Sequence, residues 1–366
     1  MKFHKILTVI PVLLLLGAGF MLTSCGPAVL MADNAGTVNL ETLDFAEYTE
    51  IEPVLEGTYL SVTTAETLAS SSSSSPRVSP CEAVWFQDEI WFLGKTGLNM
   101  GLYRLPSRED GAETIDGLLI AEKVAEPPEG AQWSGLQSAG DLLMWEQEAE
   151  NLPQERLAYS PEEGMVRPPF QGGQVMHWGG SYYVISGPAI NAALERETPD
   201  GKYDTVVKLV FRPYEETCLQ DGVFAYLHGH EERIIRIDLE ASAAKDAVAV
   251  KNGRPDGVQC NEDWLVGVTD EGQIFAYSYA AGEGHFVTQI AVDASGVDGA
   301  DARVWLRSGQ LWVLEEYQLA VYDLMDRTVQ HITLPGSKYS RWNLDAAGRL
   351  AGCDLLDGYI ITMIEG

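Results

Sequence analysis

A tight polar turn followed by a short apolar strand, often rich in aromatic residues, recurs along most of this chain. Gln87-Asp88-Glu89 precedes Ile90-Trp91-Phe92-Leu93, for example, and Ser308-Gly309-Gln310 precedes Leu311-Trp312-Val313-Leu314. Short turns of Gly, Asp and Asn between apolar strands are typical of β-hairpins. Strands of this kind begin at Ile90, Leu142, Tyr182, Val223, Trp264, Leu311 and Leu350. The pattern therefore predicts an all-β chain built from repeated hairpins.

The spacing of these strands indicates one repeating architecture. Their first residues lie 39 to 52 positions apart, and four-stranded propeller blades repeat at roughly 40–50 residues. A second apolar strand that runs into a polar turn keeps the same phase, as at residues 102–105 and 319–324. A pair of β-sandwiches also uses short strands and turns. The seven-fold period favours a β-propeller over residues 81–366, most simply with seven four-stranded blades.

These strand-turn units resemble the blades of TolB-like and related bacterial β-propellers over residues 82–366. The resemblance lies in pattern and period, since the chain has no Trp-Asp signature at its strand ends. It implies the fold and assigns no activity, because one fold hosts many functions.

Two regions depart from the regular repeat. In the third blade, residues 188–203 intervene before the strand at 206–211, which keeps six or eight blades as alternatives. The last repeat has only three strands and ends at residues 359–364. An open ring would expose an unpaired strand edge. We therefore expect a strand at 58–64 to complete the last blade, so that residues 58–80 hold this closing strand and a serine-rich linker.

The N-terminus has the layout of a secretory signal. Lys2 and Lys5 precede an apolar run at 6–20, which at about 15 residues is shorter than the roughly 20 of a membrane span. The string Leu22-Thr23-Ser24-Cys25 resembles the lipobox of bacterial lipoproteins. The resemblance implies that residues 1–24 are a signal peptide and that Cys25 is lipidated; an uncleaved membrane helix is the alternative. Residues 25–57 lack sustained periodicity and are interpreted as a tether.

The charge balance constrains the partners. The chain has 54 Asp and Glu against 24 Lys and Arg, for a formal net charge of −30. Because binding to phosphate requires clustered Lys and Arg, this composition argues against nucleic acid and against electrostatic attachment to anionic lipid. We expect a monomer that its N-terminal lipid holds on the extracytoplasmic side of the cell membrane.

Residues that could carry catalysis or hold a metal show no recognisable arrangement. There is no Gly-x-Ser-x-Gly elbow. His228 and His230 lack a nearby third ligand and are interpreted as a surface loop pair. The cysteines other than Cys25 form no CxxC pair, and either two disulfides or inert buried thiols would fit them; they are Cys81, Cys218, Cys260 and Cys353. We predict no catalytic residue, metal site or cofactor.

Loop lengths distinguish the two faces of the expected ring. In a propeller the turns between the first and second strands lie on one face, and the second-to-third and blade-to-blade connections lie on the other. The former are short here, whereas the latter include residues 125–134, 146–155, 186–203 and 293–301. Longer loops on a rigid scaffold tend to carry function. Among the acids expected there, the candidate ligand-binding residues are Glu146, Glu148, Glu150, Glu231 and Glu232.

Most of the nine tryptophans lie on the hairpins, where packing between blades explains them. Trp133 and Trp342 lie at or near strand entries and are interpreted as an exposed pair that could stack on a ligand.

Two functions fit this sequence. The first is a non-catalytic binding or scaffolding propeller, anchored to the membrane, for an envelope protein or a cell-wall polymer. The alternative is a carbohydrate-active or other hydrolytic propeller enzyme with an acidic funnel, because 54 acids offer many carboxylate pairs. A funnel of converging acids around a Trp would favour the enzyme, and a loop face without a deep pocket would favour the binding protein.

Overall fold

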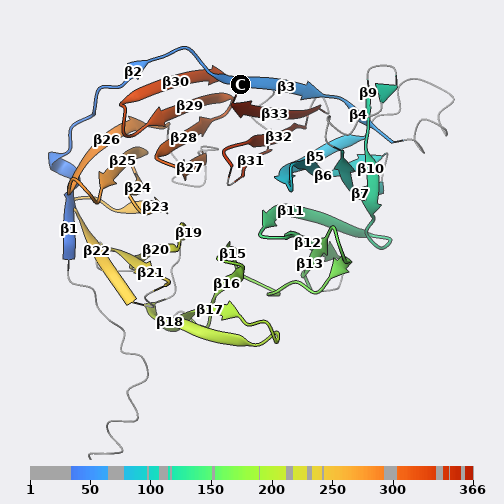
Figure 1. Ribbon diagram of the computed structural model, residues 1–366, viewed down its shortest axis with the longest axis horizontal. Helices are drawn as coiled ribbons and strands as arrows, with labels where there is room; N and C mark the ends of the chain where they lie inside the picture. Colours follow the sequence, from blue (N-terminus) through green and yellow to red (C-terminus); the bar gives the residue numbers. More distant parts are fainter. Residues whose placement is uncertain are drawn as a thin grey trace, which may run out of the picture.

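The computed structural model describes residues 34–64, 78–96, 99–106, 114–115, 118–150, 153–188, 190–211, 217–228, 233–240, 243–291, 303–334, 341–345, 347–355 and 359–365. These residues form seven sheets arranged in a ring, each with four antiparallel strands that form a blade (Figure 1). The chain is therefore an all-β, seven-bladed β-propeller, as the hydrophobic period predicts.

Each blade runs outward from an inner strand near the axis of the ring. Blade 1 holds β5 (Ser79–Phe86), β6 (Glu89–Thr96), β7 (Asn99–Leu105) and β10 (Glu122–Ala125); blade 2 holds β11 (Ala131–Ala139), β12 (Leu142–Ala149), β13 (Glu155–Ser160) and β14 (Gly164–Val166). Blade 3 holds β15 (Val175–Trp178), β16 (Ser181–Ser186), β17 (Ile190–Glu197) and β18 (Tyr203–Phe211); blade 4 holds β19 (Cys218–Gln220), β20 (Val223–His228), β21 (Arg233–Asp238) and β22 (Ala243–Lys251).

The remaining blades close the ring. Blade 5 holds β23 (Pro255–Cys260), β24 (Trp264–Thr269), β25 (Gln273–Ser278) and β26 (Glu283–Gln289); blade 6 holds β27 (Arg303–Arg307), β28 (Gln310–Glu315), β29 (Gln318–Asp323) and β30 (Thr328–Thr333). Blade 7 holds β31 (Arg341–Leu344), β32 (Leu350–Asp354), β33 (Tyr359–Glu365) and β3 (Leu55–Leu60). A small separate sheet contains β4 (Val62–Thr63), β8 (Thr114–Ile115) and β9 (Leu118–Ile120).

Tight turns between the first and second strands define one face of the ring. Gln87 and Asp88 have φ angles of 49° and 64°, and Asp221 and Gly222 have φ angles of 50° and 75°. Positive φ at both central residues is the geometry of the two-residue turn that matches the twist of a β-hairpin. We call this side the tight-turn face. The side with the second-to-third and blade-to-blade connections is the long-loop face.

The core lies between neighbouring blades. One cluster joins Trp91 of blade 1 to Trp145 of blade 2, and another joins Trp312 of blade 6 to Trp342 of blade 7. Both faces of each blade pack against neighbouring blades. In central strands such as β24 and β28, consecutive residues are therefore apolar and buried, whichever face of the sheet they point to. Large aromatic side chains fill the wedge between two twisted sheets.

An N-terminal strand closes the ring. β3 pairs antiparallel with β33, from Leu55 opposite Glu365 to Leu60 opposite Ile360. The predicted closure of the last blade is thus confirmed, although the strand spans Leu55–Leu60 rather than residues 58–64, and Val62–Thr63 form β4 in the small separate sheet. The pairing covers the edge that β33 would otherwise expose.

The residues before β3 lie along the outside of blades 4 to 6. β1 (Asn34–Asn39) runs parallel to β22, and β2 (Thr49–Glu50) runs parallel to β30. Figure 1 shows this blue segment following the rim of the ring from β1 to β3. We call residues 34–60 the strap. The described part of the expected tether is therefore packed against the propeller, and its Val38 is buried in the core.

Blade 3 is regular, so the interpretation of residues 188–203 as an irregular insertion is wrong. β17 occupies most of this range and pairs with both β16 and β18. Ala192 and Leu194 are fully buried while Asn191 is exposed. This alternation is what a strand with one face in the core requires.

The apolar run at residues 6–20 and Cys25 lie outside the described residues. Among the residues that the structure describes, no helix is long and apolar enough to cross a membrane.

Candidate ligand-binding face

The long-loop face of blade 2 is built differently from the expected ten-residue loop. β12 extends to Ala149 and β13 begins at Glu155, so the connection itself spans residues 150–154. Glu148 and Glu150 are exposed there, as expected. Of the other expected long loops, 186–203 contains β17, and 293–301 lies outside the described residues.

Glu146 is a structural residue rather than a free surface acid. It lies opposite Arg156 on the neighbouring strand, and Arg156 donates to it through Nε at 2.8 Å and lies 2.6 Å from it through Nη2. The Arg156 side chain is only 8% exposed. Because a charge this deeply buried costs several kcal/mol without its partner, Glu146 stabilises the β12–β13 pair, and its carboxylate is engaged by Arg156 rather than free for a ligand.

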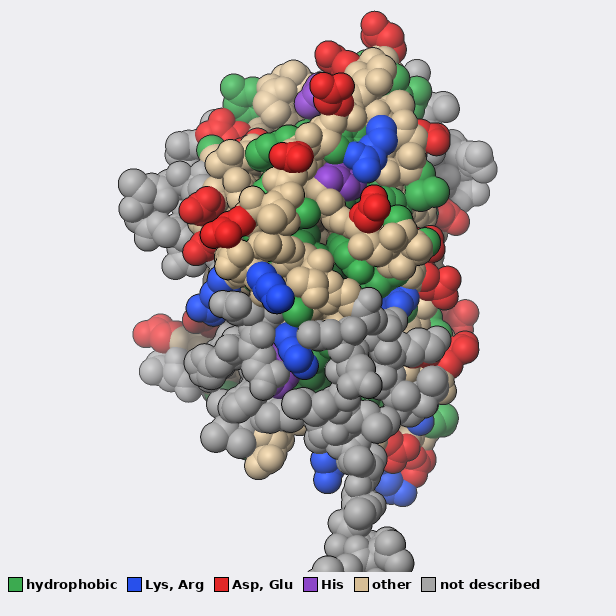
Figure 2. Space-filling view, turned by 90° about the vertical axis from the view of Figure 1, so that its left-hand side faces the viewer, with side chains coloured by type: hydrophobic (Ala, Val, Ile, Leu, Met, Phe, Trp, Pro, Cys, Tyr) green, Lys and Arg blue, Asp and Glu red, His purple; other side chains and the backbone are tan. Residues whose placement is uncertain are grey.

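Acidic side chains are spread over both faces of the ring. Figure 2 views the molecule from its strap side and shows Asp and Glu near both edges of the ring. On the long-loop face, Glu148, Glu150 and Glu271 are exposed; on the tight-turn face, Asp88 and Asp263 are exposed as well. Charge alone therefore does not select one face. Glu231 and Glu232 lie outside the described residues.

Trp133 and Trp342 are not an exposed pair, and this expectation is wrong. Their exposed fractions are 4% and 2%. Trp133 packs against Trp145 with ring centroids 5.1 Å apart, and its Nε1 donates to Gln147 Oε1 at 3.0 Å. Both rings fill the spaces between blades. Because both rings are covered, neither is available to stack on a ligand.

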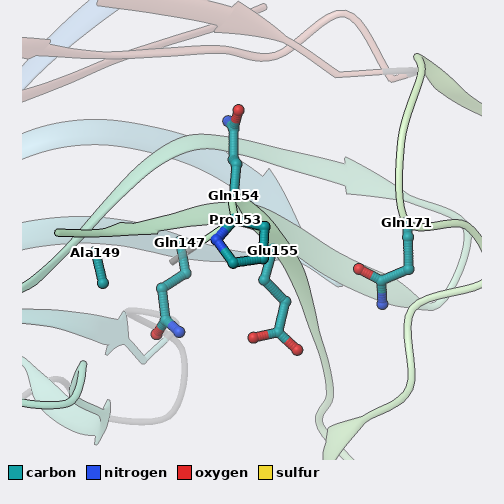
Figure 3. A pocket seen from close by; sticks show the side chains of 6 residues that line it. All are labelled: Gln147, Ala149, Pro153, Gln154, Glu155 and Gln171. Atoms are coloured by element: carbon teal, nitrogen blue, oxygen red, sulfur yellow. The ribbon is translucent and has the colours of Figure 1, made fainter. Parts of the chain in front are cut away.

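A shallow pocket opens on the long-loop face of blade 2, beside the connection to blade 3. Its volume is about 420 Å³, and it is lined by Gln147, Ala149, Pro153, Gln154, Glu155 and Gln171. Gln147 and Glu155 are opposite one another on β12 and β13. In Figure 3 their side chains extend in the same direction, the Gln171 amide lies across from Glu155, and Gln154 points the other way. None of these three glutamines was predicted, because an uncharged amide side chain on an isolated position gives no sequence signal of a binding site.

Three of the four described cysteines and one described histidine, His228, are buried. His228 is buried on β20 rather than exposed on a loop, and His230 lies outside the described residues. Cys218 and Cys260 lie in adjacent blades, and the Cys260 backbone N–H donates to Cys218 Sγ at 3.2 Å. All four described cysteines are free thiols. Within the described ranges, no three His, Cys, Asp or Glu side chains are placed to hold a metal ion.

Polar contacts at the tight-turn face tie the inner strands together. Arg307 on β27 donates to Gln220 Oε1 on β19 at 2.8 Å, across blade 5. Arg349 lies 2.7 Å from both Asp345 and Asp88, which joins blade 7 to blade 1. These arginines are committed to neighbouring blades, so the tight-turn face is stabilised internally while the polar groups of the blade 2 pocket face solvent.

No protein-family model matches the sequence, and no curated protein matches it either. The structure resembles that of virginiamycin B lyase from Staphylococcus aureus, with 14% sequence identity and a TM-score of 0.48 over 84% of this chain and 99% of that one. It also resembles AztD from Citrobacter koseri (12% identity, TM-score 0.39, 70% of this chain and 72% of that one). A third similar structure is the WD40 β-propeller domain of Doa1 (11% identity, TM-score 0.43, 85% and 98%). The similarity is one of fold.

Proposed function

We propose that this chain is a non-catalytic binding module, anchored to the cell membrane by a lipid on Cys25, whose long-loop face engages an envelope protein or a cell-wall polymer. The observation that carries the proposal is the pocket on blade 2, which is lined by polar side chains and lies beside the exposed Glu148 and Glu150. A rigid ring that presents solvent-facing polar groups on its longer connections suits recognition.

The string Leu22-Thr23-Ser24-Cys25 supports the anchor, and the acidic composition supports a partner with basic surface patches. We propose that the propeller acts as a monomer on the extracytoplasmic side and does not bind nucleic acid.

Charge reversal on blade 2 tests the binding face. The full chain, extracted in detergent, is used to capture partners from envelope extract, and the variant Glu148→Lys/Glu150→Lys is compared with Glu162→Lys/Glu163→Lys. The second pair is exposed on the opposite face of the same blade, so both variants change the net charge equally. We expect the first variant to weaken capture roughly tenfold and the control to leave it unchanged, because exposed charge pairs contribute up to about 1 kcal/mol each.

Raising the salt concentration should weaken the wild-type complex in the same way, because exposed charges are screened within about 8–10 Å. Equal effects of the two variants would place the partner elsewhere on the ring. Turnover of an envelope glycan or peptide by the purified chain would replace the binding role with a hydrolytic one.

A further inference from the structure

Two amide groups in the blade 2 pocket are held in fixed orientations by groups that can only donate. The Trp133 indole N–H donates to Gln147 Oε1 at 3.0 Å, and the Arg156 backbone N–H donates to Gln171 Oε1 at 3.4 Å. An N–H can be met only by the oxygen end of an amide. The oxygen of each glutamine is therefore occupied, and its NH₂ end is left to donate to a ligand.

The Glu155 carboxylate supplies acceptors between these two donors. Glu155 lies opposite Gln147 across the β12–β13 ladder, where paired side chains start about 5 Å apart. Figure 3 shows the Gln147 amide nitrogen on the side of Glu155, with Gln171 on the other side of the carboxylate. Within the described part of the chain, no group donates to the Glu155 side chain. The pocket thus presents one carboxylate flanked by two NH₂ groups.

This set of groups matches adjacent hydroxyls. A hydroxyl both donates and accepts, so each of two neighbouring hydroxyls can donate to a carboxylate oxygen and accept from an amide N–H. An anionic ligand would be repelled by Glu155, Glu148 and Glu150. A cationic ligand would pair with the carboxylate but has no acceptor for the NH₂ groups of Gln147 and Gln171. Leaving these two donors without a hydrogen bond is costly where the contact excludes water. Ala149 and Pro153 add apolar surface for the C–H groups of a ring.

We infer that the blade 2 pocket binds a neutral carbohydrate through a pair of adjacent hydroxyls. The inference rests on the proposed function, in that it uses the same face of the ring, and it names the ligand class. The volume of about 420 Å³ lies at the small end of the range for ligand pockets, so the pocket takes a short segment of glycan rather than a folded protein surface.

The test titrates the full chain, in a zwitterionic detergent without a sugar headgroup, with cellobiose, maltose and N,N′-diacetylchitobiose by calorimetry. We expect at least one disaccharide to bind. Glu155→Gln removes the acceptor charge, and Gln171→Glu keeps the oxygen that Arg156 requires while it removes the donor. Each variant should weaken binding at least tenfold, and thermal melting should confirm that both fold.

Gln87→Glu is the matched control, because it introduces the same charge at an exposed glutamine on the tight-turn face of blade 1, outside the pocket. It should change the affinity for the disaccharide less than twofold. Failure of all three disaccharides to bind, or wild-type binding by Gln171→Glu, would overturn the inference. If envelope partners are still captured in either case, the pocket assignment alone fails; if they are not captured, the proposed function fails with it.

Discussion

At the scale of single residues, Tyr48, His285 and Arg327 form a polar cluster that joins the strap to blades 5 and 6. Tyr48 Oη lies 2.9 Å from His285 Nε2, and Arg327 Nη2 lies 3.4 Å from His285 Nδ1. Arginine can only donate, so Nδ1 accepts and the imidazole proton resides on Nε2, where it donates to Tyr48. Burial first, and then the Arg327 charge, lower the pKa of His285 to about 4. Burial raises the pKa of Tyr48 to about 12.

This cluster predicts a loss of stability in mild acid. The folded-state pKa of His285, about 4, lies below the unfolded value of about 6.5. Between pH 6.5 and 4, His285 therefore binds a proton in the unfolded chain but not in the folded chain. The free energy of unfolding falls as the pH falls through this range. Urea denaturation should show a smaller decrease for His285→Gln than for the wild type. His331→Gln, at an exposed histidine, should follow the wild type; identical profiles for all three would contradict the prediction.

The roles of individual side chains were harder to predict than their positions. Glu146 and Glu148 are both acids near the end of one strand, and only the β12–β13 register shows that Glu146 faces Arg156. Trp133 lies near a strand entry in the sequence, yet a neighbouring blade covers it. Whether an acid is paired depends on the register with the neighbouring strand, and whether an aromatic ring is covered depends on the packing of the neighbouring blade. The hydrophobic pattern of one strand does not contain that information.

At the scale of elements, the blade strands were predictable because each repeats a local signal, whereas the strap was not. β1 and β2 pair in parallel with the outer strands of blades that lie about 200 and 280 positions further along the chain. A hairpin can be predicted from the turn sequence between its strands, but no such turn connects these pairs. The strap fits closely: a Cβ on Gly36 would lie 2.1 Å from Tyr277 Oη.

The β17 strand was predictable in principle, since Ala192 and Leu194 alternate with more exposed residues, but small and charged residues masked its apolar face.

Two deletions separate the contributions of the strap. Removing residues 26–54 takes away β1 and β2, including the buried side chains of Val38 and Leu40, and exposes the apolar surface that these side chains cover. Burial of such side chains contributes about 1.5–3 kcal/mol each. Removing residues 26–60 also takes away β3 and exposes the edge of β33. We expect the first deletion to lower the melting temperature by several degrees, and the second to lower it further by roughly 8 °C and to cause association on size exclusion. Equal effects would show that closure of the ring does not depend on β3.

At the scale of the whole molecule, the ring and its proposed anchor meet at blade 4. The described chain begins at Asn34, beside the outer strand of that blade. Cys25 lies nine positions before Asn34, and an extended chain spans at most about 3.3–3.6 Å per residue. A lipid on Cys25 would therefore hold the rim of blade 4 within about 30 Å of the bilayer. Blade 2, whose long-loop face carries the pocket, is separated from blade 4 by blade 3 in the ring (Figure 1).

This geometry predicts which blade lies nearest the membrane. A fluorophore on Lys251→Cys, at the exposed end of β22, should transfer energy to acceptors in the lipid headgroups more efficiently than one on Glu122→Cys, which is exposed on the outer strand of blade 1. Both variants carry Cys81→Ser, because Cys81 is the one described cysteine that is not buried. Adding Cys25→Ser should abolish fatty-acid labelling and remove the difference between the two positions. Equal transfer from blades 1 and 4 in the lipidated chain would show that the anchor does not orient the ring, and labelling that survives Cys25→Ser would show that the lipid is attached elsewhere.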